Sequence, residues 1–202
     1  MKKFSNRALN MHYSPIRKLV PYIDEAKRNG VKVYQLHIGQ PDVETPDTFF
    51  EGLNNYKEKI VKYTNSAGII ELRESFSKSY KKVEIDLLPE EILVTQGGSE
   101  AIQITLQTLC NPGDEVLVPE PYYTNYDSFL RIADAKLVPI ETSIENHYHL
   151  PAREEIEKLI TPKTKAIMFS NPSNPTGIVF RPEETELIKE IWVILITFSC
   201  NL

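Results

Sequence analysis

Three short segments combine residue types that can bind a phosphate or a planar ligand. The first covers residues 95–101, Thr-Gln-Gly-Gly-Ser-Glu-Ala, where two glycines let the backbone approach a ligand and Ser99 adds a hydroxyl. A helix predicted to begin at Ser99 would offer free N–H groups and a partial positive charge, which suit a phosphate. A tight turn with Ser99 as an ordinary N-cap explains the same residues. The segment is neither a Gly-x-Gly-x-x-Gly fingerprint nor a P-loop, because no lysine follows.

The second and third segments are constrained by proline. In Glu120-Pro121-Tyr122-Tyr123 a rigid turn precedes two aromatic rings, which could lie flat on a planar ligand or simply pack in the core. Residues 171–177 read Asn-Pro-Ser-Asn-Pro-Thr-Gly, and Asn-Pro bonds adopt the cis form at modest cost. An amide held on such a frame can donate to a fixed oxygen. The simpler alternative is an ordinary loop.

An alternation of strands and helices must position these segments. We predict strands at residues 92–94, 115–118, 136–140 and 166–169, and helices at 99–109, 123–132, 151–159 and 182–191. Upstream we predict helices at 15–30, 46–59 and 69–82, with an extended run at 33–38. The alternation indicates a mainly parallel sheet with right-handed crossovers. In such sheets ligands bind beyond the carboxyl ends of strands, which is where all three segments fall.

Composition narrows the class of protein. The chain has 202 residues, of which 41% are hydrophobic and 25% charged, as in ordinary globular domains. Its net charge of −5 gives no basic surface for nucleic acid. No apolar run reaches the roughly 18 residues of a membrane span, and no signal peptide follows residues 1–4. Cys110 and Cys200 cannot define a disulfide framework in a chain of this size. Because no export signal is seen, the cytoplasm is the expected compartment. We predict no metal site.

The third segment resembles the signature of class I/II, fold-type I, pyridoxal-phosphate-dependent aminotransferases, of the aspartate/aromatic kind. Other segments are similar to further family motifs, in the family's order: residues 36–46, 63–74, 96–101 and 111–116. The resemblance runs from about residue 4 to residue 191. It implies a three-layer α/β sandwich with a mainly parallel sheet. It also implies pyridoxal phosphate as cofactor, amino-group transfer between an amino acid and a 2-oxo acid, and a homodimeric full-length parent.

The resemblance assigns roles toward the cofactor. Gly98, Ser99 and Glu100 would hold its phosphate, largely through backbone N–H groups. Tyr123 falls where the family stacks an aromatic side chain on the pyridine ring. Asn174 would donate to the phenolic oxygen of that ring.

The resemblance also assigns roles outside the cofactor cradle. Gly39 would bring backbone close to the substrate carboxylate, and Tyr63 would reach the phosphate in the neighbouring subunit. Leu72 and Arg73 are expected to be structural, with Arg73 in a local ion pair.

The resemblance divides the chain into three parts. These are an N-terminal arm with part of the small domain (1–45), an incomplete cofactor-binding large domain (46–191) and a tail outside the family (192–202). The family's cofactor-binding lysine and ring-nitrogen aspartate have no match here, so we predict no catalytic residue and almost no transamination by these residues alone. The apolar run 191–198 reads as a strand, and our hypothesis for the tail is a truncated reading frame. We expect a marginally stable or aggregating chain.

Two other readings stay open. The chain could be a non-catalytic fragment that pairs with a full-length subunit through Tyr63 and the N-terminal segment. It could also be an α/β module that binds phosphate or a nucleotide at residues 97–99, although no ribose-binding acid stands in a matching βαβ frame. Lyases and decarboxylases share these motifs, and the residues do not indicate which amino acid is the substrate.

Overall fold

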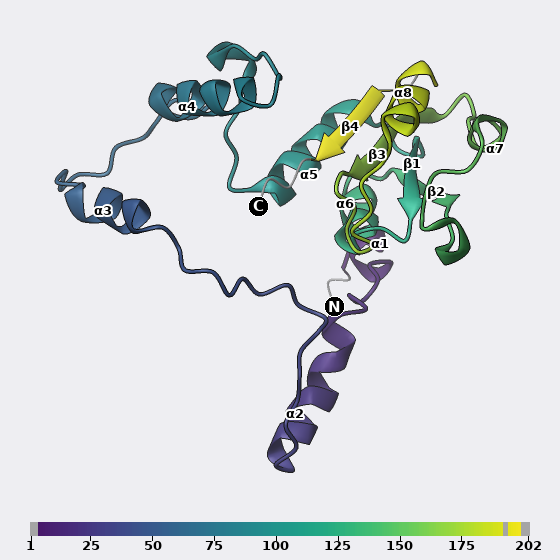
Figure 1. Cartoon of the computed structure of the whole chain (residues 1–202), viewed down its shortest axis with the longest axis horizontal. Helices are drawn as coiled ribbons and strands as arrows, with labels where there is room; N and C mark the ends of the chain where they lie inside the picture. The colour runs from purple at the N-terminus through teal and green to yellow at the C-terminus, as the bar shows by residue number, and fades with distance from the viewer. Residues whose placement is uncertain (1–3, 192–193, 199–202) are drawn as a thin grey trace. The chain divides into compact units, whose positions relative to one another are not determined.

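The computed structural model describes residues 4–191 and the backbone of residues 194–198 (Figure 1). It contains two compact units, which we describe separately. One comprises residues 1–18 together with 99–202, and the other comprises residues 19–98.

A four-stranded parallel sheet forms the centre of the first unit. Its strands are β1 (Glu115–Glu120), β2 (Lys136–Glu141), β3 (Thr164–Ser170) and β4 (Ile194–Phe198), in the order β2-β1-β3-β4. In the register, Leu117 pairs with Val138 on one side and with Ile167 on the other. The strands predicted near 115–118, 136–140, 166–169 and in the run 191–198 are thereby confirmed.

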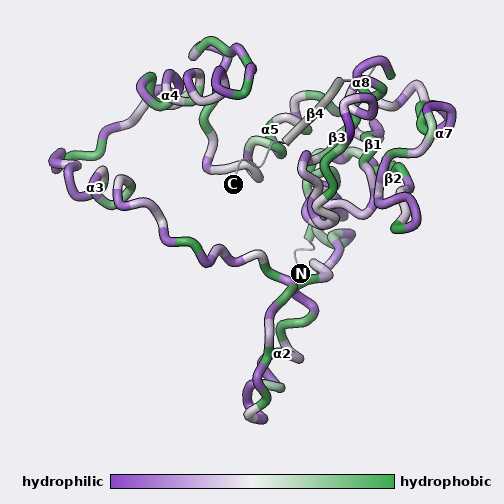
Figure 2. The backbone as a smooth tube through the Cα atoms, viewed as in Figure 1, coloured by the Kyte–Doolittle hydropathy of each residue, from purple (hydrophilic) through white to green (hydrophobic). Residues whose placement is uncertain are grey.

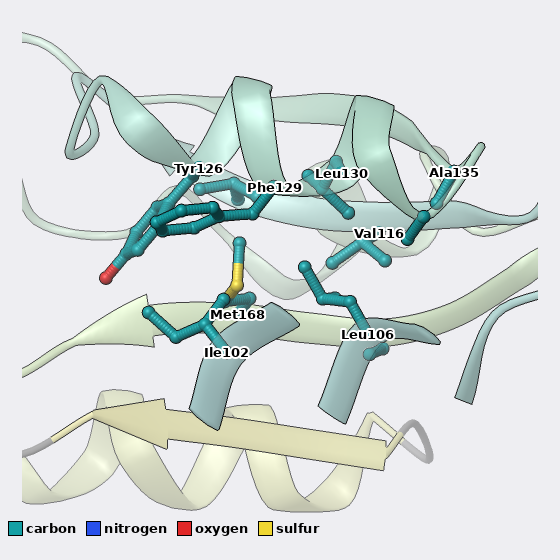
Figure 3. Packing of buried hydrophobic residues seen from close by; sticks show 11 residues of the cluster. Ile102, Leu106, Val116, Tyr126, Phe129, Leu130, Ala135 and Met168 are labelled. Atoms are coloured by element: carbon teal, nitrogen blue, oxygen red, sulfur yellow. The ribbon is translucent and has the colours of Figure 1, made fainter. Parts of the chain in front are cut away.

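Helices cover both faces of this sheet. They are α5 (Gly98–Leu109) and α6 (Asn125–Ile132) on one face, and α7 (Arg153–Glu157) and α8 (Pro182–Glu190) on the other. Side chains alternate across a strand, so Val116 and Val118 of β1 pack against α5 and α6, while Leu117 packs against α7 and α8. Figure 3 shows the first of these clusters, with Met168 of β3 near Ile102 of α5. The predicted three-layer α/β architecture is confirmed.

The buried carboxylate of Glu115 closes the amino-terminal edge of the sheet. It accepts hydrogen bonds from Thr161 Oγ1 at 2.7 Å and from Lys136 Nζ at 3.3 Å. The bond from Thr161, followed by the attraction of Lys136, holds the pKa of Glu115 below its ordinary value despite burial. The charged carboxylate therefore stabilises the folded unit at neutral pH.

Glu115 predicts a pH dependence of unfolding. A carboxyl whose pKa is lowered by folding contributes stability that is complete above its unfolded pKa of about 4.3 and is lost as the pH falls through the folded value. We expect Glu115→Gln to lower the urea midpoint at pH 7 and to weaken the loss of stability that follows as the pH falls below the unfolded pKa of about 4.3. Urea titrations followed by circular dichroism at several pH values measure this. Parallel pH curves for both proteins would contradict it.

The second unit has helices but no core. Its helices are α2 (Val20–Arg28), α3 (Asp47–Asn55) and α4 (Ile70–Lys81). None of residues 19–98 is buried, and large apolar side chains such as Phe49, Leu53 and Ile60 are exposed. Figure 2 shows hydrophobic residues interspersed with hydrophilic ones along these helices. Helices of this length gain most of their stability from packing, so this unit gives a physical basis for the predicted marginal stability.

The predicted strand at residues 92–94 is wrong. Ile92 has extended dihedral angles, with φ −108° and ψ 123°, and follows a 3-10 turn at Pro89–Glu91. No ladder forms there, however, and Leu93 is 60% exposed. An extended segment becomes a strand only when a neighbour satisfies its N–H and C=O groups. Apolar β-branched residues alone supply no such neighbour.

Several helix ends also differ from the predictions. α2 begins at Val20 after a 3-10 turn at Arg17–Leu19, rather than at Pro15, because Pro21 suits the first turn of a helix. Gly30, at φ +74°, ends this helix as expected. α3 stops at Asn55 rather than 59, and α6 starts at Asn125 rather than 123. The short α1 (Asn6–Leu9), capped by Ser5, was not predicted.

Candidate functional site

The loops after β1 and β3 lie at one edge of the sheet. These strands are parallel neighbours, so their carboxyl ends point the same way. The loop after β1 carries Tyr122 and Tyr123, and the loop after β3 carries residues 171–177. Two of the three predicted ligand segments are thereby brought to a single edge.

Tyr123 is fixed by its neighbours on the β1 loop. Its ring meets the ring of Tyr126 edge to face, at 5.5 Å between centroids and 89° between planes. Its hydroxyl accepts a hydrogen bond of 2.6 Å from Asn125 Nδ2. The ring is half-buried against the cluster under α5 and α6. The Glu120–Pro121 bond before it is cis, and Thr142 Oγ1 donates to the Glu120 carbonyl at 2.6 Å. The loop thus holds an aromatic ring in a defined place.

The β3 loop is cross-linked by its own hydrogen bonds. The Asn174 N–H donates to Ser170 Oγ at 3.1 Å, and the Gly177 N–H donates to the Ser173 carbonyl at 2.8 Å. Gly177 has φ +73°, a left-handed conformation that favours glycine. Both Asn-Pro bonds, 171–172 and 174–175, are cis. The side chain of Asn174 is exposed, so its carboxamide is accessible to a ligand.

The third segment turns into α5. Gly97 has φ +124°, which a residue with a side chain rarely adopts, and Thr95 Oγ1 donates to its carbonyl at 2.9 Å. α5 begins at Gly98, so Ser99 lies inside the first turn and is not the N-cap. The first N–H groups of an α-helix have no acceptor within the helix. About one turn further along, Ile102 packs in the cluster that contains Tyr126 and borders Tyr123. The helix start is therefore tied to the Tyr123 loop through the core.

Gly39 and Tyr63 belong to the other unit. Both are exposed in segments without regular structure, and a Cβ added at Gly39 would meet no atom within 4 Å. Their roles toward substrate and a neighbouring subunit stay predictions. No ion pair of Arg73 is found among the described residues, and its buried Nε has no hydrogen-bond partner there.

Three supporting residues were missed by sequence reasoning. Asn125 and Tyr126 hold the Tyr123 ring, and the hydroxyl of the buried Ser170 accepts a hydrogen bond from the backbone N–H of Asn174. Ser170 carried a signal, because a hydroxyl at the end of a buried strand needs a hydrogen-bond partner. Nothing in residue type marked Asn125.

Acidic residues surround the neighbouring Tyr122. Burial raises the pKa of its hydroxyl, and the carboxylates of Asp127 and Glu120 raise it further. Asp127 is paired with Arg131 at 2.8 Å. Tyr122 thus stays a neutral phenol at physiological pH.

The described part of the chain offers neither a metal-binding cluster nor a membrane-spanning helix. No cluster of His, Cys, Asp or Glu side chains there could hold a metal ion. None of its helices combines the length and hydrophobicity that crossing a bilayer requires.

Comparison with solved structures defines the class. The chain is similar to an alanine aminotransferase from Pyrococcus furiosus, with a TM-score of 0.89 and 34% identity over 96% of this chain and 51% of that one. It is also similar to an aspartate aminotransferase from Thermotoga maritima, with a TM-score of 0.88 and 31% identity over 96% of this chain and 53% of that one. These neighbours have the fold-type I architecture.

Comparison of sequences shows the family. The family model "Aminotransferase class I and II" matches residues 31–196, and the chain belongs to this family. It is 37% identical over 180 residues to a probable aspartate/prephenate aminotransferase of Rickettsia bellii, covering 88% of this chain and 45% of that protein. It is 36% identical over 171 residues to the aspartate/prephenate aminotransferase of Thermus thermophilus, covering 84% and 44%. The chain spans about half the length of these relatives.

The family depends on pyridoxal phosphate, and the residues present fit parts of that molecule. The start of an α-helix, with its partial positive charge, and the exposed Ser99 hydroxyl suit a phosphate. The fixed Tyr123 ring suits a flat heterocycle, and the Asn174 amide suits an oxygen acceptor. The donor set therefore agrees with the family cofactor.

Proposed function

We propose that this chain carries the cofactor cradle of a pyridoxal-phosphate-dependent aminotransferase. The observation that carries the proposal is the shared edge of β1 and β3, which brings Tyr123 and the Asn174 loop together beside the core that anchors α5. Ser99 and the adjoining N–H groups of Gly98 and Glu100 bind the phosphate. Tyr123 lies on the ring, and Asn174 donates to its phenolic oxygen.

The whole protein to which this cradle belongs transfers an amino group between an amino acid and a 2-oxo acid. Bound pyridoxal phosphate supplies the electron sink for that chemistry, while the residues described here bind and orient it. We place the protein in the cytoplasm and its full-length form in a homodimer, in which Tyr63 reaches the partner's phosphate and Gly39 the substrate. The 202 residues alone bind the cofactor without transaminating, because no lysine among them stands in a matching context.

Cofactor affinity tests this proposal. We expect the 202-residue chain to bind pyridoxal phosphate about 10- to 100-fold more tightly than pyridoxal, because charge-assisted hydrogen bonds to the phosphate add about 1.5–3 kcal/mol. Titration followed by the visible absorbance and tyrosine fluorescence measures both affinities. Equal affinities, or displacement of the cofactor by an equimolar nucleoside triphosphate, would show a different kind of site.

A further inference from the structure

A buried carboxylate joins two distant parts of the first unit at the edge that bears the candidate site. Glu184, on the first turn of α8, is 7% exposed. It accepts three hydrogen bonds: from Leu150 N and Arg181 N, each at 2.7 Å, and from His149 Nδ1 at 2.9 Å. Arg181 ends the loop that began at Asn171, whereas His149 and Leu150 precede α7. One side chain therefore ties the connection between β2 and α7 to the exit of the Asn174 loop.

The rest of the loop is continuous with this tie. The Phe180 N–H donates to Asn171 Oδ1 at 3.1 Å, so the two ends of the loop are linked to each other. The Phe180 ring is buried and meets Phe169 of β3 edge to face at 5.5 Å. Within the loop, the Ser173 N–H donates to the Ile178 carbonyl at 2.8 Å. Hydrogen bonds and chain neighbours therefore connect Arg181 with the residues that flank Asn174.

His149, which bonds to Glu184, follows directly after an unusual turn. His147 and Tyr148 have φ of 50° and 60°, the left-handed region that residues with side chains seldom occupy in succession. The Tyr148 N–H donates to the Ser143 carbonyl at 2.8 Å, which closes this turn. A conformation of this kind persists only where its surroundings hold it, and the bond from His149 to Glu184 does so.

Glu184 stays ionised in this place. Burial raises its pKa, but the donors of Arg181, Leu150 and His149 together outweigh burial and hold the pKa below its ordinary value. A charged acceptor strengthens all three hydrogen bonds. Removing it would leave buried donors without a partner, which is costly.

We infer that Glu184 and His149 are positioning residues for the cofactor site. They hold the loop that presents the side-chain amide of Asn174, although neither residue touches the ligand. The inference extends the proposed function, since the ligand held is the pyridoxal phosphate of that proposal. Its effect on the loop, however, is measurable without any cofactor.

Amide hydrogen exchange of the 202-residue chain, resolved by residue with NMR, tests the inference. In Glu184→Ala we expect the backbone N–H groups of Asn174 and Gly177 to exchange about tenfold faster or more, because the loop opens more often. Neither amide donates to Glu184, so a residue that only capped α8 would leave them unchanged. Ile167 in β3 reports on global unfolding. Glu190→Ala is the matched control, because Glu190 lies on the same helix and pairs with Arg153 of α7 at 2.8 Å, but is exposed.

A second pair of variants keeps the test decisive if Glu184→Ala unfolds the chain. His149→Ala removes a donor to Glu184, while His149→Asn places an amide N–H near the position of Nδ1. We expect faster Asn174 exchange in His149→Ala, recovered in His149→Asn, with pyridoxal phosphate affinity following the same order. Unchanged Asn174 exchange in His149→Ala would overturn the inference. If the wild-type chain binds no cofactor but the exchange pattern is as expected, the proposed function fails. The role of Glu184 and His149 in holding the Asn174 loop is then still supported.

Discussion

Replacing Ser99 by glutamate is expected to weaken pyridoxal phosphate binding by about a hundredfold or more, because two negative groups would then lie at the same helix start. The same substitution should leave the fold intact. Ser99 is exposed in the first turn of α5, where a carboxylate interacts favourably with the helix dipole by about 0.3–1 kcal/mol. Cofactor affinity is thus predicted to fall while the free energy of unfolding rises slightly. This difference distinguishes damage to the binding site from unfolding of the chain. Cofactor titration and urea denaturation on the same samples measure both.

The matched control for Ser99→Glu is Gln107→Glu. Gln107 is exposed near the other end of α5, so the variant has the same net charge but leaves the helix start untouched. Its cofactor affinity should equal that of the unmodified chain. If both variants lose affinity equally, the effect comes from overall charge and the phosphate does not sit at Ser99.

Leu117→Ala is expected to lower the free energy of unfolding by about 2–5 kcal/mol, the range for a fully buried leucine that leaves a cavity. Leu117 is fully buried on β1, between β2 and β3, and packs with Ile156 and Ile188 of the covering helices. Small domains are stable by only about 5–15 kcal/mol, so this one change should unfold a large part of the chain population at moderate urea. Urea titration followed by circular dichroism gives the midpoint.

Leu9→Ala provides the comparison for Leu117→Ala. Leu9 lies in the same unit but is 62% exposed, so the same loss of side chain should change the free energy by no more than about 0.5 kcal/mol. Equal midpoints for the two variants would mean that the sheet does not form the core of this chain in solution.

The sheet of the first unit was predictable because its strands carry their own signal. Short runs of apolar residues, separated by segments with helical spacing, mark these strands in the sequence. Within β1, Val116 and Leu117 then point to opposite faces of the sheet. The segment at residues 92–94 has the same composition, yet is no strand, because pairing depends on a neighbour that no local pattern encodes. The observed helix ends differ from the predicted ones for local reasons. For example, Pro21 in the first turn places the start of α2 at Val20.

The site was predictable in its parts and less so in its assembly. Proline, glycine and asparagine marked the loops around Tyr123 and Asn174, since these residues restrict the backbone strongly. The contacts that fix the loops were not predictable, because Ser170, Asn125 and Glu184 act through distances that only folding sets. Glu184 in particular pairs with His149, 35 residues away in sequence.

Mapping the bound cofactor by NMR tests the central claim most directly. Pyridoxal phosphate titrated into the labelled 202-residue chain should shift the amide signals of Ser99, Tyr123 and Asn174 together, with one common saturation curve. Ser99 lies at the start of α5, and Tyr123 and Asn174 lie on the loops after β1 and β3, so only a ligand that touches all three places can shift all three signals together. Shifts confined to surface lysines, or three signals that saturate at different concentrations, would contradict the account.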